Sequence, residues 1–173
     1  MERLVGKNAP CFEMNAVIGD GENFTKVSLE DYKSKWLVMF FYPLDFTFVC
    51  PTEITAYSKR IAEFKKEGAE VLGASTDSEY SHQAWIQGSL GKLNFPLASD
   101  FTKKVAKDYG ILVEEDGLAL RGLFIIDPQG VVRYSVVHDL NVGRSVDETL
   151  RVLQALKSGG LCPIDWVPGE ATL

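Results

Sequence analysis

Apolar runs alternate with amphipathic segments along the chain. The segment "KWLVMFFY" (35–42) is a continuous apolar run, which is typical of a strand covered on both faces. Apolar residues then recur with helical spacing from Ile54 to Phe64, and Gly68 marks the end of this segment. The following stretch "AEVLGAST" (69–76) indicates a second buried strand. The pattern therefore predicts a strand, a helix and another strand over this part of the chain.

Two further helices are expected in the middle of the chain. The segment "SEYSHQAWIQ" (78–87) indicates a helix that is closed by Gly88. A loop follows, and the next helix is expected over 102–109, with its end at Gly110. The alternation of strands and helices thus continues past the second strand.

The last part of the chain predicts a hairpin, a helix and an arm. In "GLFIIDPQGVVRYSVV" (122–137), two apolar runs flank an Asp-Pro-Gln-Gly turn, which indicates a β-hairpin. Ser145 begins a helix through a Ser-x-x-Glu capping box with Glu148. The periodicity stops after Lys157, and the glycines and prolines of "SGGLCPIDWVPGEATL" (158–173) indicate an arm outside the core. The apolar stripe of the helix consists of Val146, Leu150, Leu153 and Leu156.

This order of elements predicts an α/β fold. A β-α-β-α beginning, followed by a hairpin and a closing helix, implies a central mixed sheet with helices on both faces. A thioredoxin-like arrangement is one of few short α/β folds with this order, although the order alone does not distinguish it from a small flavodoxin-like domain. We expect one domain over residues 1–157 and a C-terminal arm over residues 158–173.

Composition and charge exclude several classes of function. The 173 residues suit one domain, and 46% apolar with 24% charged residues is typical of an ordinary globular protein. The net charge of −6 argues against nucleic-acid and anionic membrane surfaces, because both partners require a basic face. The longest apolar run, 36–44, is far too short to span a bilayer.

The cysteines favour a reducing compartment. Cys11, Cys50 and Cys162 are too few for a disulfide scaffold in a chain of this length, so any disulfide is expected to be catalytic or redox-sensing. The beginning of the sequence, "MERLVGKNAP", has neither an apolar signal core nor a cleavage-like site. We therefore expect no export and a cytoplasmic protein.

One cysteine lies at the junction of a predicted strand and a predicted helix, in "FFYPLDFTFVCPTE" (40–53). Pro43 ends the strand, and Pro51 suits the first turn of the helix that follows. The start of a helix favours an anion, and therefore the thiolate form of Cys50. Thr47 lies one turn earlier, where its hydroxyl can reach the sulfur or simply cap the helix. The local pattern leaves open whether Cys50 is reactive or an inert buried cysteine.

A family resemblance bears on that choice. The pattern Pro43-x-x-x-Thr47-x-x-Cys50 resembles the peroxidatic motif of the peroxiredoxins. The segment around it is similar to the typical two-cysteine peroxiredoxins, which include the peroxidase component of bacterial alkyl hydroperoxide reductase. The likeness continues through "GLALRGLFIIDPQG", "VGRSVDETLR" and "CPIDWVPG", and it covers essentially the whole chain. It implies a thioredoxin-like fold and the reduction of hydrogen peroxide and organic hydroperoxides, for antioxidant defence and redox homeostasis.

The resemblance also implies roles for individual residues. Cys50 attacks the peroxide and becomes a sulfenic acid. Thr47 bonds a peroxide oxygen, and Pro43 shields the site from water. Arg121 reaches the active-site sulfur, favouring the thiolate and polarising the peroxide; without the resemblance it would be taken for a strand-end arginine in water.

Further residues around this site have more than one interpretation each. Glu53 can orient an arginine, or it can complement the dipole of the helix that it begins. Arg144 can join the same network, contribute to an interface or be solvated. Phe46 and Phe48 are expected to wall the pocket and exclude water, although core packing would give the same pattern. Trp85 is expected in the core, and the family resemblance offers packing near the site as an alternative.

The resemblance assigns the second step to Cys162. Cys162 resembles the resolving cysteine of the family, which comes from the other subunit of a dimer and reacts with the sulfenic acid of Cys50. The alternative is that it is an incidental thiol in the arm. The implied assembly is a homodimer with two Cys50–Cys162 disulfides, and a decamer of five dimers when reduced. No cofactor is implied, because electrons come from thioredoxin or a flavoprotein disulfide reductase. Cys11 matches no role in the family and is expected to be buried in packing.

The remaining features suggest no other site. His82 and His138 are isolated from cysteines, other histidines and carboxylate arrays, so no metal is expected. Two other function classes stay open: a disulfide oxidoreductase, against which the missing Cys-x-x-Cys counts, and a non-enzymatic holdase, because family members assemble into rings.

Resistance to overoxidation is the first testable expectation. Easily overoxidised peroxiredoxins have a Gly-Gly-Leu-Gly loop and a C-terminal helix bearing Tyr-Phe. Here residues 88–91 are Gly-Ser-Leu-Gly, and the sequence ends at Leu173 without such a helix. We expect the site to open readily and the sulfenic acid to be resolved quickly. Mass spectrometry after many peroxide turnovers measures this, and rapid accumulation of Cys50 sulfinic acid at modest peroxide would contradict it.

Overall fold

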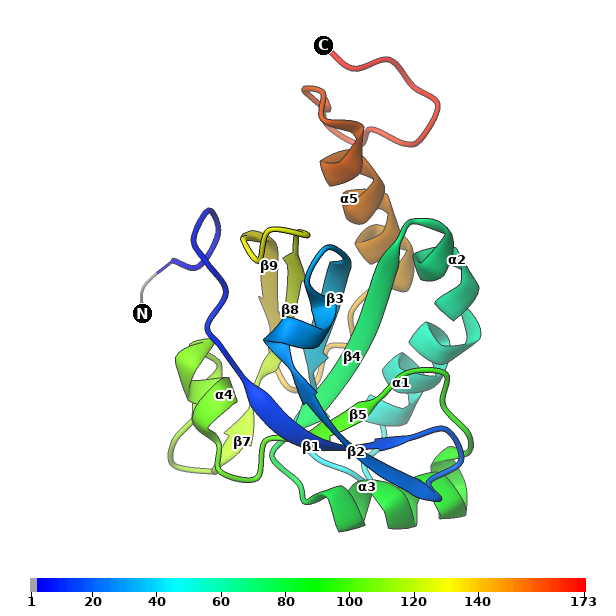
Figure 1. Ribbon diagram of the computed structural model, residues 1–173, viewed down its shortest axis with the longest axis vertical. Coiled ribbons are helices and arrows are strands. Elements are labelled where there is room, and N and C mark those ends of the chain that lie inside the picture. Colours follow the sequence, from blue (N-terminus) through cyan, green and yellow to red (C-terminus); the bar gives the residue numbers. More distant parts are fainter. Residues whose placement is uncertain (1–2) are drawn as a thin grey trace.

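A mixed β-sheet runs through the centre of the computed structural model, which describes residues 3–173 (Figure 1). Seven strands lie in the order β2-β1-β5-β4-β3-β8-β9. β3, β4 and β5 are parallel, whereas the β1–β2, β1–β5, β3–β8 and β8–β9 pairs are antiparallel. The strands are β1 (Glu13–Ile18), β2 (Asn23–Ser28), β3 (Trp36–Phe41), β4 (Ala69–Ser75), β5 (Leu97–Ser99), β8 (Arg121–Ile126) and β9 (Val132–His138), and a separate pair is formed by β6 (Leu112–Val113) and β7 (Leu118–Ala119).

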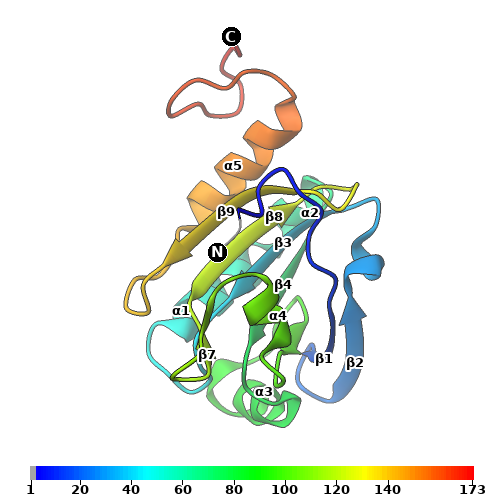
Figure 2. The ribbon, with the colours of Figure 1, turned by 90° about the vertical axis from the view of Figure 1, so that its left-hand side faces the viewer.

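Helices cover both faces of this sheet, as the sequence predicted. Side chains of β3 alternate between two buried clusters: Val38 and Phe40 lie in one, and Leu37 and Met39 in the other. α1, α2 and α5 contribute to the first cluster, and α4 with the N-terminal segment contributes to the second (Figures 1 and 2). The helices are η1 (Leu29–Tyr32), α1 (Cys50–Lys59), α2 (Ile61–Lys66), α3 (Glu79–Trp85), η2 (Ile86–Leu90), α4 (Lys104–Asp108) and α5 (Val146–Ser158).

The strongest strand predictions are confirmed, whereas three strands of the large sheet and the small β6–β7 pair were missed. β3 and β4 lie within the two predicted buried strands, and β8 and β9 form the predicted hairpin. β1 and β2 were not predicted, and β5 lies in the segment that was predicted to be a loop. These three strands extend the sheet on the side of β4, away from the hairpin.

The helix predicted from Ile54 to Gly68 is two helices. The break falls at Arg60, whose φ of −101° and ψ of 12° depart from helical values. Next to the break, the side-chain amide of Asn94 donates to the carbonyl oxygen of Ser58 at 3.1 Å, and its backbone N–H donates to the Ser58 hydroxyl at 3.0 Å. An inserted amide competes with the regular helix hydrogen bond, and this accounts for the break.

Two predicted helix ends also differ in the structure. α3 ends at Trp85 and is followed by η2, a π-helical turn that is closed by Gly91 with a φ of +83°. The helical backbone is interrupted at Gly88, where the end was predicted, since its φ of −92° and ψ of −105° are not helical. At the start of α5, the Ser145 hydroxyl accepts the backbone N–H of Glu148 at 3.2 Å. The carboxylate of Glu148 pairs with Arg151 at 2.6 Å, so only one half of the predicted capping box is formed.

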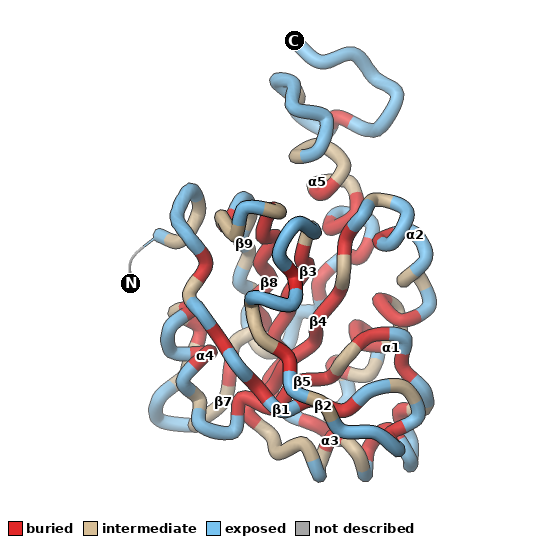
Figure 3. Tube along the Cα trace, viewed as in Figure 1, coloured by how far each residue is buried: buried red, intermediate tan, exposed pale blue. Residues whose placement is uncertain are grey.

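The chain leaves the body of the molecule after α5. Residues 159–173 have neither helix nor strand and extend beyond the end of α5 (Figures 1 and 2). Most of this arm is exposed, as Figure 3 shows, although Trp166 is buried. Over residues 3–173, none of the helices has the length and apolar character needed to cross a bilayer.

Packing of α5 on the sheet makes a testable contribution to stability. We predict that Leu153→Ala lowers the free energy of unfolding by about 3 kcal/mol, because truncating a fully buried leucine loses its burial and leaves a cavity. Leu156→Ala is the matched control, since Leu156 lies on the same stripe but is only partly buried. Urea unfolding midpoints measure both, and an equal loss in the two variants would contradict the assignment of the core.

Candidate active site

Cys50 is the first residue of α1, at the end of the loop that follows β3. Pro51 lies in the first turn, as predicted, and the Val49 carbonyl oxygen accepts the Thr52 backbone N–H at 3.0 Å and the Thr52 hydroxyl at 2.6 Å. Cys50 has an exposed fraction of 0%. The sulfur is therefore held at the positive end of a helix, in a place from which bulk water is excluded.

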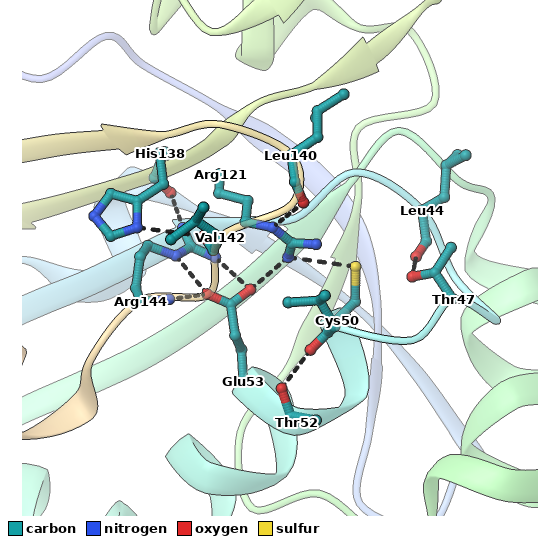
Figure 4. Close-up of polar contacts among 12 residues, drawn as sticks. Leu44, Thr47, Cys50, Thr52, Glu53, Arg121, His138, Leu140, Val142 and Arg144 are labelled. Carbon is teal, nitrogen blue, oxygen red and sulfur yellow. Dashed lines mark hydrogen bonds and ion pairs between the residues drawn. The ribbon is translucent and has the colours of Figure 1, made fainter.

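Arg121 begins β8, and its guanidinium group is directed at the sulfur (Figure 4). Nη1 donates to Cys50 Sγ at 3.5 Å and to Glu53 Oε2 at 2.6 Å, and Nε donates to the Leu140 carbonyl oxygen at 2.7 Å. The side chain is buried, so it is not the solvated strand-end arginine that its sequence position alone would suggest. Three partners fix the guanidinium plane, and a cation is held next to the thiol.

Glu53 lies one turn after Cys50, between Arg121 and Arg144 (Figure 4). Its Oε1 accepts the backbone N–H of Arg144 at 2.7 Å and Nε at 2.8 Å, while its Oε2 accepts Nη2 at 3.1 Å. Burial opposes ionisation of this carboxyl, but the hydrogen bonds and charges of Arg144, with the charge of Arg121, outweigh it and lower the pKa of Glu53. Glu53 is therefore a buried anion that orients two arginines.

The charges of this buried group are not balanced within Glu53, Arg121 and Arg144. Arg121 and Arg144 carry two positive charges and Glu53 carries one negative charge, which leaves one positive charge uncompensated. An unpaired charge is costly in a buried site. Ionised Cys50 would supply the missing negative charge 3.5 Å from Arg121 and make the group neutral.

The protein core supports Arg144. Its Nη1 donates to the carbonyl oxygen of Gly122 at 2.6 Å, and its guanidinium group lies 5.4 Å from the ring centroid of Phe40. The Phe40 ring is in turn stacked on the ring of Tyr57 of α1, with 4.7 Å between the ring centroids. Arg144 is therefore supported by residues of three elements: strand β3, strand β8 and helix α1.

Thr47 and Pro43 lie in the loop between β3 and α1. Pro43 is buried, whereas Thr47 is partly exposed and donates its hydroxyl to the Leu44 carbonyl oxygen at 2.9 Å. The N-terminal cap of α1 is Val49, so the interpretation of Thr47 as a plain helix cap is wrong. Because its proton is engaged by Leu44, the Thr47 oxygen is available as an acceptor.

Two expectations about aromatic side chains have different outcomes. Phe46 and Phe48 are 60% and 94% exposed, so they do not wall a pocket within this chain. The loop bends outward at Phe46, which has a φ of +55°, and this directs Phe48 into solvent. Trp85 is buried as expected, and its ring packs beside the Phe46 ring, with 5.7 Å between the ring centroids.

The other two cysteines lie apart from Cys50. Cys162 is in the arm, where its Sγ lies 3.3 Å from the Ser158 hydroxyl and 3.6 Å from the Ala155 carbonyl oxygen at the end of α5. Figures 1 and 2 show this end of α5 away from the start of α1. Cys11 is exposed, so the expectation of a buried Cys11 is wrong. The structure thus brings together Cys50, Glu53, Arg121 and Arg144, but not Cys162 of the same chain.

Sequence reasoning missed the backbone groups that orient the arginines. The carbonyl oxygens of Leu140 and Gly122 carry no side-chain signal, so nothing in the composition of these segments indicates their role. It also missed Asp45, a buried carboxylate in the loop before Cys50. The signal that could have found it is its place as an acidic residue within an otherwise apolar stretch. Within residues 3–173, no group of three or more His, Cys, Asp and Glu side chains is arranged to hold a metal ion.

Comparisons with known proteins agree with this geometry. The family model described as AhpC/TSA matches residues 5–135. A Clostridium pasteurianum protein named for its place in the rubredoxin operon is 67% identical, with 100% of both chains covered. Peroxiredoxin-1 of Gallus gallus is 54% identical over 98% of this chain and 89% of its own. The reduced 2-Cys peroxiredoxin of Plasmodium vivax, 40% identical, superposes with a TM-score of 0.93 over 99% of this chain and 93% of that one.

The position of Glu53 predicts an acid-sensitive contribution to stability. Because its pKa is lowered in the folded state, the contribution is complete above the ordinary pKa of glutamate and is lost as pH falls through the lowered value. We expect Glu53→Gln to lower the free energy of unfolding at pH 7 by about 3 kcal/mol, because two buried guanidinium groups lose their anion.

Urea unfolding at pH 7 and at pH 3 measures both effects. The difference in stability between the wild-type protein and Glu53→Gln is expected to shrink on acidification. The exposed Glu22→Gln is the control and is expected to change stability little at either pH. A difference that stayed constant with pH would show that Glu53 is not held as a buried anion.

Proposed function

The chain belongs to the AhpC/TSA family of peroxiredoxins, which are thiol-dependent peroxidases, and from that premise we propose that it reduces hydrogen peroxide and organic hydroperoxides through Cys50. The observation that carries the assignment to Cys50 is the contact between its sulfur and the guanidinium of Arg121, 3.5 Å away at the start of a helix. We infer a role in antioxidant defence and redox homeostasis in the cytoplasm.

The first step is attack of the Cys50 thiolate on one peroxide oxygen. The new S–O bond forms as the O–O bond breaks, so the sulfur is oxidised to a sulfenic acid and the departing oxygen is reduced to an alcohol or water after taking up a proton. Arg121 is positioned to stabilise negative charge that develops on the departing oxygen. The free lone pairs of the Thr47 oxygen can accept the peroxide O–H and hold the molecule in line, while Pro43 limits the access of water.

The second step joins Cys50 to Cys162 of a partner subunit. The partner's thiol attacks the sulfenic sulfur, which forms a disulfide and releases water. Support comes from the arm, which is directed away from Cys50 of its own chain and exposes apolar side chains such as Leu161 and Ile164, at 72% and 89%. Strand β9 is also an edge strand of the sheet. These features suit a homodimer, which we propose assembles further into a decamer of five dimers.

The catalytic cycle closes with a dithiol protein. Thioredoxin or a flavoprotein disulfide reductase would exchange its dithiol for the Cys50–Cys162 disulfide and restore both thiols. The proposed chemistry requires no bound cofactor, metal, nucleic acid or membrane, because the electrons reach the sulfur through disulfide exchange. Separate reconstitution with each of the two reductants identifies the electron donor.

Peroxide consumption with a dithiol reductant tests the two cysteine roles. We expect Cys50→Ser to abolish turnover, because the nucleophile is lost. Cys162→Ser is expected to allow one oxidation for each site and to block recycling. Cys11→Ser is the control and is expected to retain activity. Full activity of Cys50→Ser would refute the peroxidase assignment.

Mixing the two inactive variants tests the partner subunit's role. A hybrid dimer of Cys50→Ser and Cys162→Ser chains retains one complete pair across its interface, and random mixing gives about a quarter of wild-type activity by symmetry. Non-reducing gels would then show one disulfide-linked dimer band from the mixture and none from either variant alone. A disulfide within one chain would give no recovery on mixing.

A further inference from the structure

A second buried carboxylate, Asp45, lies in the loop that precedes Cys50. Its Oδ1 accepts the Tyr42 hydroxyl at 2.8 Å. Its Oδ2 accepts the Ser81 hydroxyl at 2.7 Å and lies 2.8 Å from Nδ1 of His82. Tyr42 directly follows β3, whereas Ser81 and His82 belong to α3. The carboxylate therefore connects the loop to two elements outside it.

His82 is 0% exposed, and both of its ring nitrogens face acceptors. Nδ1 faces Asp45, and Nε2 lies 3.0 Å from the carbonyl oxygen of Ala98 on β5. Nδ1 also lies 3.4 Å from the Tyr42 hydroxyl. The ring is therefore held by polar contacts at both nitrogens, and His82 and Asp45 form a buried hydrogen-bonded pair.

The backbone of Asp45 is held as firmly as its side chain. Its N–H donates to Asp77 Oδ2 at 2.9 Å, and the Ser75 hydroxyl donates to the same oxygen at 2.7 Å. Burial, followed by the charge of Asp45, raises the pKa of Tyr42 well above its ordinary value, which keeps the Tyr42 hydroxyl protonated as a donor. Asp45 is thus a fixed point of the loop.

The chain beyond Asp45 is held much less firmly. Residues 46–52, here termed the Cys50 segment, begin at Phe46 in the left-handed region, which is unfavourable for an aromatic residue. Polar side chains in this segment bond locally: Thr47 to Leu44, and Thr52 to Val49. The next residue, Glu53, is a second buried carboxylate, and it lies between two guanidinium groups. The Cys50 segment therefore lies between two buried carboxylates.

We propose that the Asp45–His82 pair is a positioning device that fixes one end of the Cys50 segment, while Glu53 fixes the other, so that only these residues rearrange when Cys50 meets Cys162. This inference rests on the proposed disulfide, because a fully buried Cys50 has to leave its place to form it. His82 and Asp45 touch neither the sulfur nor the peroxide in this account. They act through the position of Thr47 and Cys50.

The two fixed ends limit how far Cys50 can travel. Cys50 lies three residues before Glu53, and an extended chain covers about 3.5 Å per residue, so its Cα stays within about 11 Å of Glu53. Glu53 keeps its contacts with Arg121 and Arg144 during this movement. The cationic pocket is therefore preserved for the returning thiol, and the partner's Cys162 has to approach this end of α1.

Loss of the pair is expected to change the two chemical steps in opposite directions. When the Cys50 segment is less firmly held, Cys50 spends less time beside Arg121, so sulfenic acid formation becomes slower. The rearranged segment is then more populated, so disulfide formation from the sulfenic acid becomes faster. General destabilisation of the protein would slow both steps instead.

Hydrogen exchange of Asp45→Asn is the direct test. We expect exchange of the backbone amides in residues 46–52 to accelerate about tenfold, because a charge-assisted contact is lost, and exchange in β3 and α5 to stay unchanged. Tyr42→Phe removes one donor to Asp45 and is expected to give a smaller acceleration in the same segment, which keeps the test valid if Asp45→Asn fails to fold. The exposed Asp20→Asn, in the turn between β1 and β2, is the matched control.

Two further measurements separate positioning from a purely structural role. Nitrogen NMR of His82 is expected to show that the Nδ1 signal of the wild-type protein shifts in Asp45→Asn, because Nδ1 loses its carboxylate partner. Stopped-flow kinetics of Asp45→Asn are expected to show slower sulfenic acid formation together with faster disulfide formation. Unchanged exchange in residues 46–52, or a uniform increase across the sheet, would overturn the proposal.

The exchange result is independent of the proposed peroxidase function. It is measured on the reduced protein without peroxide, so it does not require turnover. If the wild-type protein consumed no peroxide while exchange increased only in the Cys50 segment, the function would be refuted and the two fixed ends would stand. If the wild-type protein turned over peroxide normally while exchange was unchanged in the variants, the function would stand and the two fixed ends would be refuted.

Discussion

The ion pairs of Glu53 with Arg121 and Arg144 are the interaction on which the site depends. One carboxylate holds two guanidinium groups in the protein interior, and the excess positive charge lies beside Cys50. Removing charged groups from water is costly. The cost is offset here by hydrogen bonds to both carboxylate oxygens of Glu53, and by those that the two guanidinium groups donate to the Leu140 and Gly122 carbonyl oxygens. The Cys50 sulfur lies directly beside this group, 3.5 Å from Nη1 of Arg121.

The fold explains how residues so far apart in sequence form this group. β3 and β8 are antiparallel neighbours, with Phe40 paired to Leu123, so Arg121 at the start of β8 lies close to the loop that leaves the end of β3. α1 begins from that loop and packs against β3 through Tyr57 and Phe40. The connection from β9 to α5 then returns Arg144 to the same end of the sheet.

The sequence predicted elements where local pattern and burial agree. The continuous apolar runs identify β3 and β4, and the turn chemistry identifies the hairpin of β8 and β9. The break at Arg60 could not be predicted, because it depends on Asn94 from a distant loop. For the site, the junction of strand and helix indicated Cys50, but only the family resemblance selected Arg121. Its burial depends on long-range packing that no local pattern of charges reveals.

The proposed function places two opposing requirements on the Cys50 thiol. Attack on peroxide requires a sulfur that is enclosed and close to a fixed cation, whereas resolution requires the same sulfur to be accessible to a second thiol. Full burial of Cys50 beside Arg121 meets the first requirement. The second is met most economically if a short stretch of chain rearranges between firm ends, since the cationic group and the sheet then stay intact. Buried carboxylates at Asp45 and Glu53 have the positions that this solution needs, one on each side of the cysteine.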